Sequence, residues 1–189
     1  MNVGLFFGSF NPIHIGHLII AESLLESTPL EQVWLVISPQ NPFKEKKSLL
    51  NAYDRYRLAE IATADNPRIF PSNVEFNLPT PSYTIDTLTE LTRQFPTYDF
   101  SLLMGGDNLG SLHKWKKAEV IVQEYNIYAY PRKESKPPQV ESPRIQQAEA
   151  PLMEISATNI RKRLAEDRSV RYLLPPEVIR YIREHNLYT

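Results

Sequence analysis

Short apolar runs alternate along this chain with longer segments whose apolar residues recur at helical spacing. We expect strands at 2–7, 32–38, 98–106, 126–132 and 151–155, and a weaker extended segment at 68–76. We expect helices at 15–28, 52–65, 83–95, 156–167 and 175–188, with one or two short helices inside 109–125. Because strands separated by helices imply right-handed crossovers, this alternation predicts a mainly parallel sheet with helices on both faces, the doubly wound, Rossmann-like α/β architecture.

The length of the chain predicts a single domain over residues 1–189, since a chain of this size builds one sizeable core and is short for two. The stretch 133–150, KESKPPQVESPRIQQAEA, is rich in Pro, Ser, Glu and Gln and has no hydrophobic period. We therefore expect a surface excursion there. In a doubly wound sheet, ligands bind beyond the carboxyl ends of the strands, so a site is expected in the loops at that edge.

Charge and composition argue against several classes of partner. The 21 basic and 22 acidic residues leave a net charge of −1, which argues against long nucleic acid but leaves a small anionic ligand open. No apolar run approaches the roughly 20 residues that span a membrane. The chain has no cysteine, and its start, MNVGLFF, lacks the features of a secretory signal, so we expect a cytoplasmic protein.

The stretch GSFNPIHIGH, residues 8–17, lies at the first expected joint between a strand and a helix. Gly8 allows a close approach of the backbone, Pro12 stiffens the turn, and Gly16 leaves room for a phosphate at the start of the helix. His14 and His17 are three residues apart, so on a helix they are neighbours beside the unpaired N–H groups of the first turn. Together these features predict an anion pocket.

Two other interpretations of the histidine pair remain open from the residues alone. One or both rings could simply cap the helix or pack against the turn. The pair could also bind zinc, although no third ligand is evident and the chain has no cysteine.

The complete pattern G-x-F-x-P-x-H-x-G-H resembles the signature of the HxGH nucleotidyltransferases. The resemblance continues over nearly the whole chain, outside 133–150, to the bacterial nicotinate mononucleotide adenylyltransferase family. The blocks that carry it are PSYTIDTL (81–88), LLMGGDNLGSLHKW (102–115), ISATNIRKRL (155–164) and YLLPPEVIRYIREHNLY (172–188). Phe7 and Asn11 depart from the pattern, where many relatives have glycine and aspartate, and neither change removes a phosphate ligand.

The resemblance implies a role for each residue of these blocks. It makes His14, His17 and Arg161 the catalytic residues, and it makes Thr84 and Trp115 the contacts to the carboxylate and the ring of nicotinate mononucleotide. Nine further residues are expected to contact ATP: Gly8, Ser9, Phe10, Gly16, Lys44, Gly105, Asp107, Ser156 and Thr158.

Taken without the resemblance, several of these residues have ordinary structural explanations. Lys44 would be a surface lysine, Trp115 a half-buried packing residue, and Asp107 the cap of a short helix. Thr84 and Ser156 are expected at the N-cap positions of their own helices. Thr158 and Arg161 would then lie in an ordinary capped helix with a solvated basic face.

The reaction implied by the resemblance is adenylyl transfer from ATP to nicotinate mononucleotide, giving nicotinate adenine dinucleotide and pyrophosphate on the route to NAD. Mg²⁺ would accompany ATP, and no metal site of the protein's own is expected. The attacking phosphate is already anionic, so the reaction needs neither a general base nor a covalent nucleophile. A nicotinamide mononucleotide or phosphopantetheine acceptor, a nucleotide-binding protein without turnover, and a homo-oligomer remain open.

Overall fold

The computed structural model describes residues 1–39, 49–133, 137, 139 and 141–189. Its strands are β1 (Asn2–Gly8), β2 (Gln32–Ile37), β3 (Ile69–Ser72), β4 (Asp99–Gly105), β5 (Asn126–Tyr130) and β6 (Ile145–Gln147). Its α-helices are α1 (Ile15–Ser27), α2 (Ala52–Thr63), α3 (Thr84–Gln94), α4 (Gly106–Leu109), α5 (Ala118–Glu124), α6 (Ala157–Ala165) and α7 (Pro176–Glu184). Two 3₁₀ helices, η2 (Val74–Asn77) and η3 (Leu112–Lys114), complete the described elements.

The six strands form one sheet in the order β3-β2-β1-β4-β5-β6, and every pair of neighbours is parallel. This confirms the expected doubly wound, Rossmann-like fold. The strand order reverses between β1 and β4, which are neighbours in the sheet. A crevice for a ligand opens at such a point in this architecture, beyond the carboxyl ends of the two strands. The loops after β1 and β4 are therefore the first place to look for a site.

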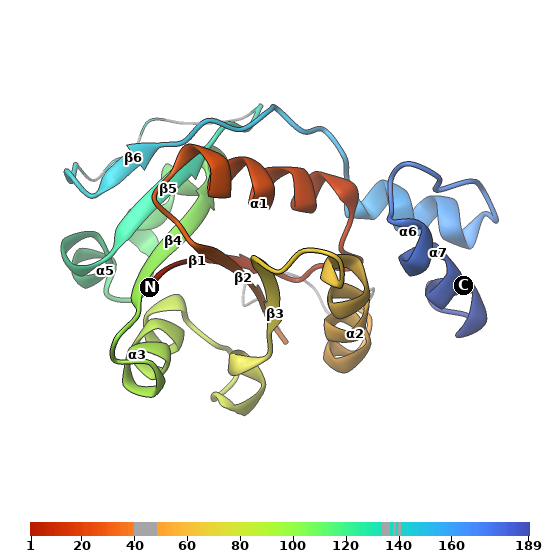
Figure 1. Cartoon of the computed structure of the whole chain (residues 1–189), viewed down its shortest axis with the longest axis horizontal. Helices are drawn as coiled ribbons and strands as arrows, with labels where there is room; N and C mark the ends of the chain where they lie inside the picture. The colour runs from red at the N-terminus through yellow and green to blue at the C-terminus, as the bar shows by residue number, and fades with distance from the viewer. Residues whose placement is uncertain (40–48, 134–136, 138, 140) are drawn as a thin grey trace.

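Both faces of the sheet are buried, as a parallel sheet with helices on either side requires. Val3 and Leu5 belong to a core shared with α3 and α5, whereas Phe6 belongs to a second core shared with α1, α2, α6 and α7. Figure 1 shows α1 along one face and α3 along the other. Alternate residues of one strand thus serve opposite cores, which explains the nearly continuous apolar run in β1.

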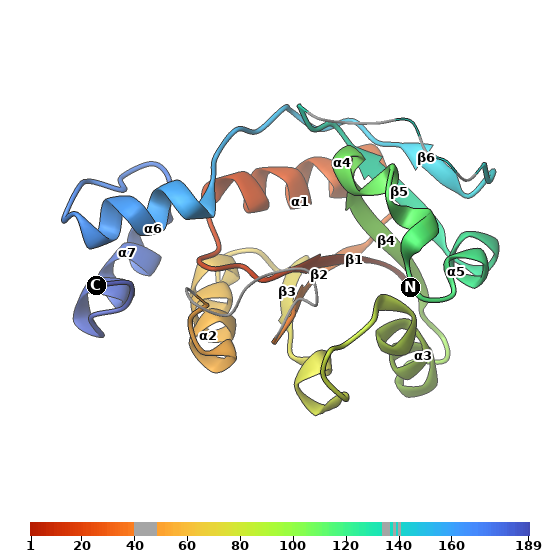
Figure 2. The ribbon, with the colours of Figure 1, turned by 180° about the vertical axis from the view of Figure 1, so that it is seen from behind.

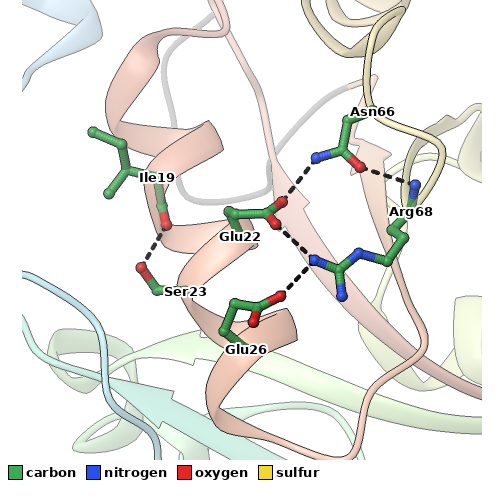
Figure 3. Close-up of polar contacts among 6 residues, drawn as sticks. All are labelled: Ile19, Glu22, Ser23, Glu26, Asn66 and Arg68. Carbon is green, nitrogen blue, oxygen red and sulfur yellow. Dashed lines mark hydrogen bonds and ion pairs between the residues drawn. The ribbon is translucent and has the colours of Figure 1, made fainter.

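Polar side chains tie the solvent side of α1 to the chain just before β3 (Figure 3). The Arg68 guanidinium lies 2.7 Å from Glu22 and 2.5 Å from Glu26, and the Asn66 side-chain amide donates to Glu22 at 2.7 Å. All three charged side chains are well exposed, so each ion pair adds little by itself. These contacts join the C-terminal half of α1 to the start of β3.

The strand expected at 151–155 is wrong. The last strand is β6, which lies inside the expected surface excursion and pairs with β5. Residues 151–155 instead form an irregular crossing from β6 over α1 to α6 (Figure 1). Met153 and Ile155 are apolar because they pack partly buried against the α1-side core, not because they belong to the sheet.

The extended segment expected at 68–76 is confirmed only in its first half, where β3 pairs with β2. Its second half forms η2. A search of the described residues finds no helix with the length and hydrophobicity that a membrane span requires.

Candidate active site

The loop between β1 and α1 lies at the candidate site, beyond the carboxyl end of β1. Phe10 adopts a left-handed backbone conformation, with φ of 42°, and its side chain is only 2% exposed. Its ring lies so close to Gly8 that a Cβ atom there would stand 2.9 Å from ring carbons. Gly8 thus makes room for the Phe10 ring, which packs edge-on against Phe6 and His17.

The rings of His14 and His17 are stacked, with centroids 3.6 Å apart and planes 18° from parallel. His14 is the N-cap of α1 and its main-chain N–H donates to His17 Nδ1 at 3.2 Å. Because Nδ1 of His17 accepts this bond, a neutral His17 carries its proton on Nε2. His17 therefore offers a fixed N–H donor to a ligand.

His14 is 6% exposed, and its ring lies over Gly16, where a Cβ atom would come within 3.2 Å of Nδ1. No described residue forms a hydrogen bond with this buried Nδ1. Burial, together with the nearby positive charge of Arg132, lowers the pKa of His14 to about 4. His14 is thus a neutral imidazole at physiological pH. Gly16 accommodates that ring, a contact that sequence reasoning did not foresee.

The first turn of α1 is less open than expected. The N–H of Ile15 donates to the Leu173 carbonyl at 2.9 Å, and the N–H of His17 donates to the His14 carbonyl at 2.9 Å. These amides are already paired, so a ligand at this turn would depend more on the imidazole side chains than on the main chain. The Leu173 bond also ties the segment before α7 to the start of α1.

Helix α6 brings Arg161 to the same loop. One guanidinium nitrogen of Arg161 donates to the Asn11 carbonyl at 2.7 Å, and the other donates to Thr158 Oγ1 at 3.3 Å. Ser156 is the N-cap of α6, as expected, but its side chain makes no capping hydrogen bond. Figures 1 and 2 show α6 and α7 beyond the end of the sheet at which α1 begins.

The end of β4 forms the opposite side of this edge. Gly105 ends the strand, and a Cβ atom there would stand 2.4 Å from Asp107 Oδ1 and 3.1 Å from Arg132 Cγ. Arg132 follows β5 and places its guanidinium over the Tyr130 ring, 5.5 Å from the centroid. Its charge also acts on His14. A carboxylate and a guanidinium thus lie beside the switch point.

Thr84 and Trp115 come from two segments that contact each other. Lys116 forms an ion pair of 2.8 Å with Asp86 and lies 4.8 Å from the centre of the Tyr83 ring, so the start of α3 adjoins the segment after η3. The expectation that Thr84 is an N-cap is wrong. Tyr83 is the N-cap, because its carbonyl accepts the N–H of Thr87, and Thr84 is the first residue of the helix. Trp115 is half-buried against the α3-side core.

Three residues near the site were missed by sequence reasoning: Arg55, Glu75 and Arg132. Arg55 could have been noticed, since it lies one helical turn before the buried pair Leu58 and Ala59 and so shares their face. Nothing local singles out the other two. The expected ligand Lys44 lies outside the described residues.

No group of three or more potential metal-ligating side chains occurs among the residues that the structure describes. A cavity of about 350 Å³ lies elsewhere, between β2, β3 and α3, and contains none of the expected site residues. It is lined by Trp34, Ser72, Asn73, Val74, Asn77, Leu78, Glu90, Leu91, Gln94 and Phe95.

Comparison with known proteins gives consistent matches over the chain. The family model described as cytidylyltransferase-like matches residues 5–163. A probable nicotinate-nucleotide adenylyltransferase of Flavobacterium psychrophilum is 48% identical over 100% of this chain and 99% of its own, and one of Cytophaga hutchinsonii is 46% identical with the same coverage.

Among solved structures, the Plasmodium falciparum nicotinic acid mononucleotide adenylyltransferase complexed with NaAD superposes with a TM-score of 0.81 at 22% identity, covering 99% of this chain and 97% of that one. At this identity the superposition supports the fold alone. The family match and the full-length relatives go further: the chain belongs to the cytidylyltransferase-like family and is a nucleotidyltransferase.

Proposed function

We propose that this nucleotidyltransferase is a nicotinate-nucleotide adenylyltransferase, which transfers the adenylyl group of ATP to nicotinate mononucleotide and releases pyrophosphate. The full-length relatives carry that name. The observation that supports it most is the convergence at the switch point: the stacked His14 and His17 lie in the loop that also receives Arg161 from α6. Donors from two distant parts of the chain, the stretch 14–17 and Arg161, meet where this fold binds ligands.

In this proposal the chain acts by positioning and by electrostatics. The phosphate of nicotinate mononucleotide attacks the α-phosphorus of ATP, the bond from that phosphorus to the bridging oxygen breaks, and pyrophosphate departs. His17, through Nε2–H, and Arg161 stabilise the negative charge that develops on the phosphoryl oxygens. Neutral His14 adds a hydrogen bond without a charge, since its pKa lies far below neutral.

Nucleotidyltransferases generally use a divalent metal, and we propose Mg²⁺. The described residues suit a metal that arrives with the nucleotide, because they form no three-residue ligand cluster and Mg²⁺ is often held by one or two carboxylates and substrate phosphates. Asp107, an exposed carboxylate at the end of β4, is the residue that would assist. When bound, the metal would neutralise phosphate charge.

The preference for the acid form of the acceptor would come from α3 and Trp115. The first turn of an 11-residue helix favours a carboxylate, and Thr84 lies in that turn. Trp115 offers an aromatic surface for the pyridine ring. Nicotinamide mononucleotide has no carboxylate and would lose the helix contact.

A pyrophosphate-release assay with ATP, Mg²⁺ and one acceptor at a time tests the proposal. Nicotinate mononucleotide should give a kcat/KM roughly 5- to 30-fold higher than nicotinamide mononucleotide, since a charge at a helix terminus is worth about 1–2 kcal/mol in a favourable geometry. Phosphopantetheine should give no release. Release with phosphopantetheine alone, or ATP binding without any turnover, would contradict the assignment.

A further inference from the structure

Arg55 is the largest fully buried side chain of the described residues, and its positive charge is surrounded by main-chain carbonyl groups. Its guanidinium donates to four main-chain carbonyls and to no carboxylate that the structure describes. Nε donates to Leu50 at 2.9 Å, one terminal nitrogen donates to Ser9 at 2.5 Å and Ser38 at 2.9 Å, and the other donates to Pro39 at 3.1 Å. A buried cation is costly unless such partners surround it.

The four carbonyls come from three separate stretches of chain. Ser9 lies in the loop after β1, Ser38 and Pro39 follow β2, and Leu50 precedes α2. Only a planar fork with several N–H groups can reach all of them at once, whereas the single ammonium of a lysine cannot. Arg55 thus joins the carboxyl ends of two neighbouring strands to the start of α2.

The same contacts continue to the expected catalytic residues. The N–H of Leu50, whose carbonyl Arg55 binds, donates to the Asn11 side chain at 3.3 Å. The Asn11 carbonyl accepts from Arg161 at 2.7 Å. Arg55 and Arg161 are therefore linked through Leu50 and Asn11. The loop that Arg55 holds at Ser9 leads directly into His14.

The C-terminal tail brings one more buried polar group, the Tyr188 hydroxyl, to this network. The Tyr188 hydroxyl is buried and finds no hydrogen-bond partner among the described residues. It lies near enough to Arg55 and Arg161 for both charges to act on it. The Tyr188 hydroxyl oxygen thus lies near the guanidinium groups of Arg55 and Arg161, which are 106 positions apart in the sequence.

We propose that Arg55 is a positioning residue for the ATP side of the site: by fixing the main chain at Ser9 and Leu50, it sets the places of His14, His17 and Arg161. This inference rests on the proposed function. It predicts a selective effect, because Thr84 and Trp115 belong to the opposite face of the sheet and have no part in the network. Loss of the Arg55 guanidinium should weaken the binding of ATP and leave the binding of nicotinate mononucleotide unchanged.

The test compares Arg55→Lys with Arg57→Lys, which is the same substitution two positions further along α2. Arg57 is exposed, and among the described residues it forms an ion pair only with Glu60 on its own helix, so its variant should behave as the unchanged protein. The first readout is calorimetric binding of a non-hydrolysable ATP analogue and, separately, of nicotinate mononucleotide. The second is kcat for pyrophosphate release, measured well below each variant's melting temperature.

For Arg55→Lys we expect analogue affinity to fall about 10-fold and kcat to fall roughly 100-fold, as a shift of about 1 Å in reacting groups would cause. Affinity for nicotinate mononucleotide should stay within about twofold. If both affinities fall together, or neither falls, the proposal is wrong. If Arg55→Lys does not fold, Asn11→Ala is measured instead. It removes the hydrogen bond from the Leu50 N–H, and it should lower the affinity for the ATP analogue but not the affinity for nicotinate mononucleotide.

The two proposals fail in distinguishable ways. If the unchanged protein releases no pyrophosphate with nicotinate mononucleotide, the proposed function fails. The binding of the ATP analogue to Arg55→Lys, Arg57→Lys and Asn11→Ala then still decides whether Arg55 positions the nucleotide side.

Discussion

His17 is held in one tautomer by the main-chain N–H of His14, and this makes its Nε2–H a donor fixed in advance. Replacing it by alanine should lower turnover by about 100-fold or more, the usual cost of losing one such donor to a developing charge. Pyrophosphate release under saturating substrates measures the effect. His185→Ala is the control, because His185 is exposed and stacks on Tyr181 at the far end of α7. Unchanged turnover in His17→Ala would refute the assigned role.

His14 makes stability depend on pH. Its pKa is about 4 in the folded protein and about 6.5 when unfolded, so between these values the unfolded chain binds more protons. Stability should therefore fall as the pH is lowered from 7, by about 2 kcal/mol at pH 5 from this residue alone, and be constant above pH 7. Urea unfolding of the protein and of His14→Asn across this range measures the difference. If the unfolding free energies of the two proteins change with pH in the same way, His14 does not titrate as described.

Among single residues, the sequence predicted correctly that His14 and His17 lie side by side, while their binding of a ligand stays a prediction. The histidine pair, the glycines and the turn lie within ten positions, so their spacing alone predicts that they meet. Arg132 could not be found this way because His14, on which its charge acts, lies far along the chain. Glu75 was missed because its contacts with Ser82 and Thr87 depend on how η2 packs against the start of α3. The assigned purpose of Gly16 also changed, since only packing shows that it makes room for the His14 ring.

Among the elements, the start of α3 depends on a buried carboxylate. Glu75 of η2 is 2% exposed and accepts from Ser82 and Thr87, each at 2.8 Å. Glu75→Ala removes the acceptor of the Ser82 hydroxyl and leaves the Thr87 hydroxyl only the long contact to the Tyr83 carbonyl at 3.4 Å, so it should cost about 2–3 kcal/mol of unfolding free energy. It should also raise KM for nicotinate mononucleotide more than KM for ATP, because Thr84 lies between the two anchored hydroxyls.

Chemical denaturation and the two KM values check this prediction, with Glu119→Ala on exposed α5 surface as the control. An intact stability in Glu75→Ala, or an equal rise in both KM values, would show that Glu75 does not anchor α3.

Element types were predicted better than element boundaries. Helices α3, α6 and α7 have apolar residues at clear helical spacing, and the expected helices and buried strands agree with the observed ones within a few residues. The false strand at 151–155 shows the limit, because an apolar stretch that crosses a helix has the same composition as a short strand. Thr84 illustrates the other limit: a good capping residue lies one position inside the helix, where the chain geometry makes Tyr83 the cap.

For the whole molecule, the alternation of strands and helices was enough to predict a parallel doubly wound sheet. It did not predict the strand order, because pairing depends on contacts between distant segments. That order makes β1 and β4 neighbours and places the histidine loop beside Asp107 and Arg132. Arg161 on α6 reaches the same loop through tertiary packing, which the sequence pattern alone does not predict.

In the proposed function, His17 and Arg161 hold the phosphate tail of ATP beyond the carboxyl ends of β1 and β4. A crystal structure of the protein with Mg²⁺ and a non-hydrolysable ATP analogue tests it most directly. We predict phosphate oxygens within about 3 Å of His17 Nε2 and of the Arg161 guanidinium. A phosphate tail bound elsewhere, with both imidazole rings still packed against protein alone, would contradict it.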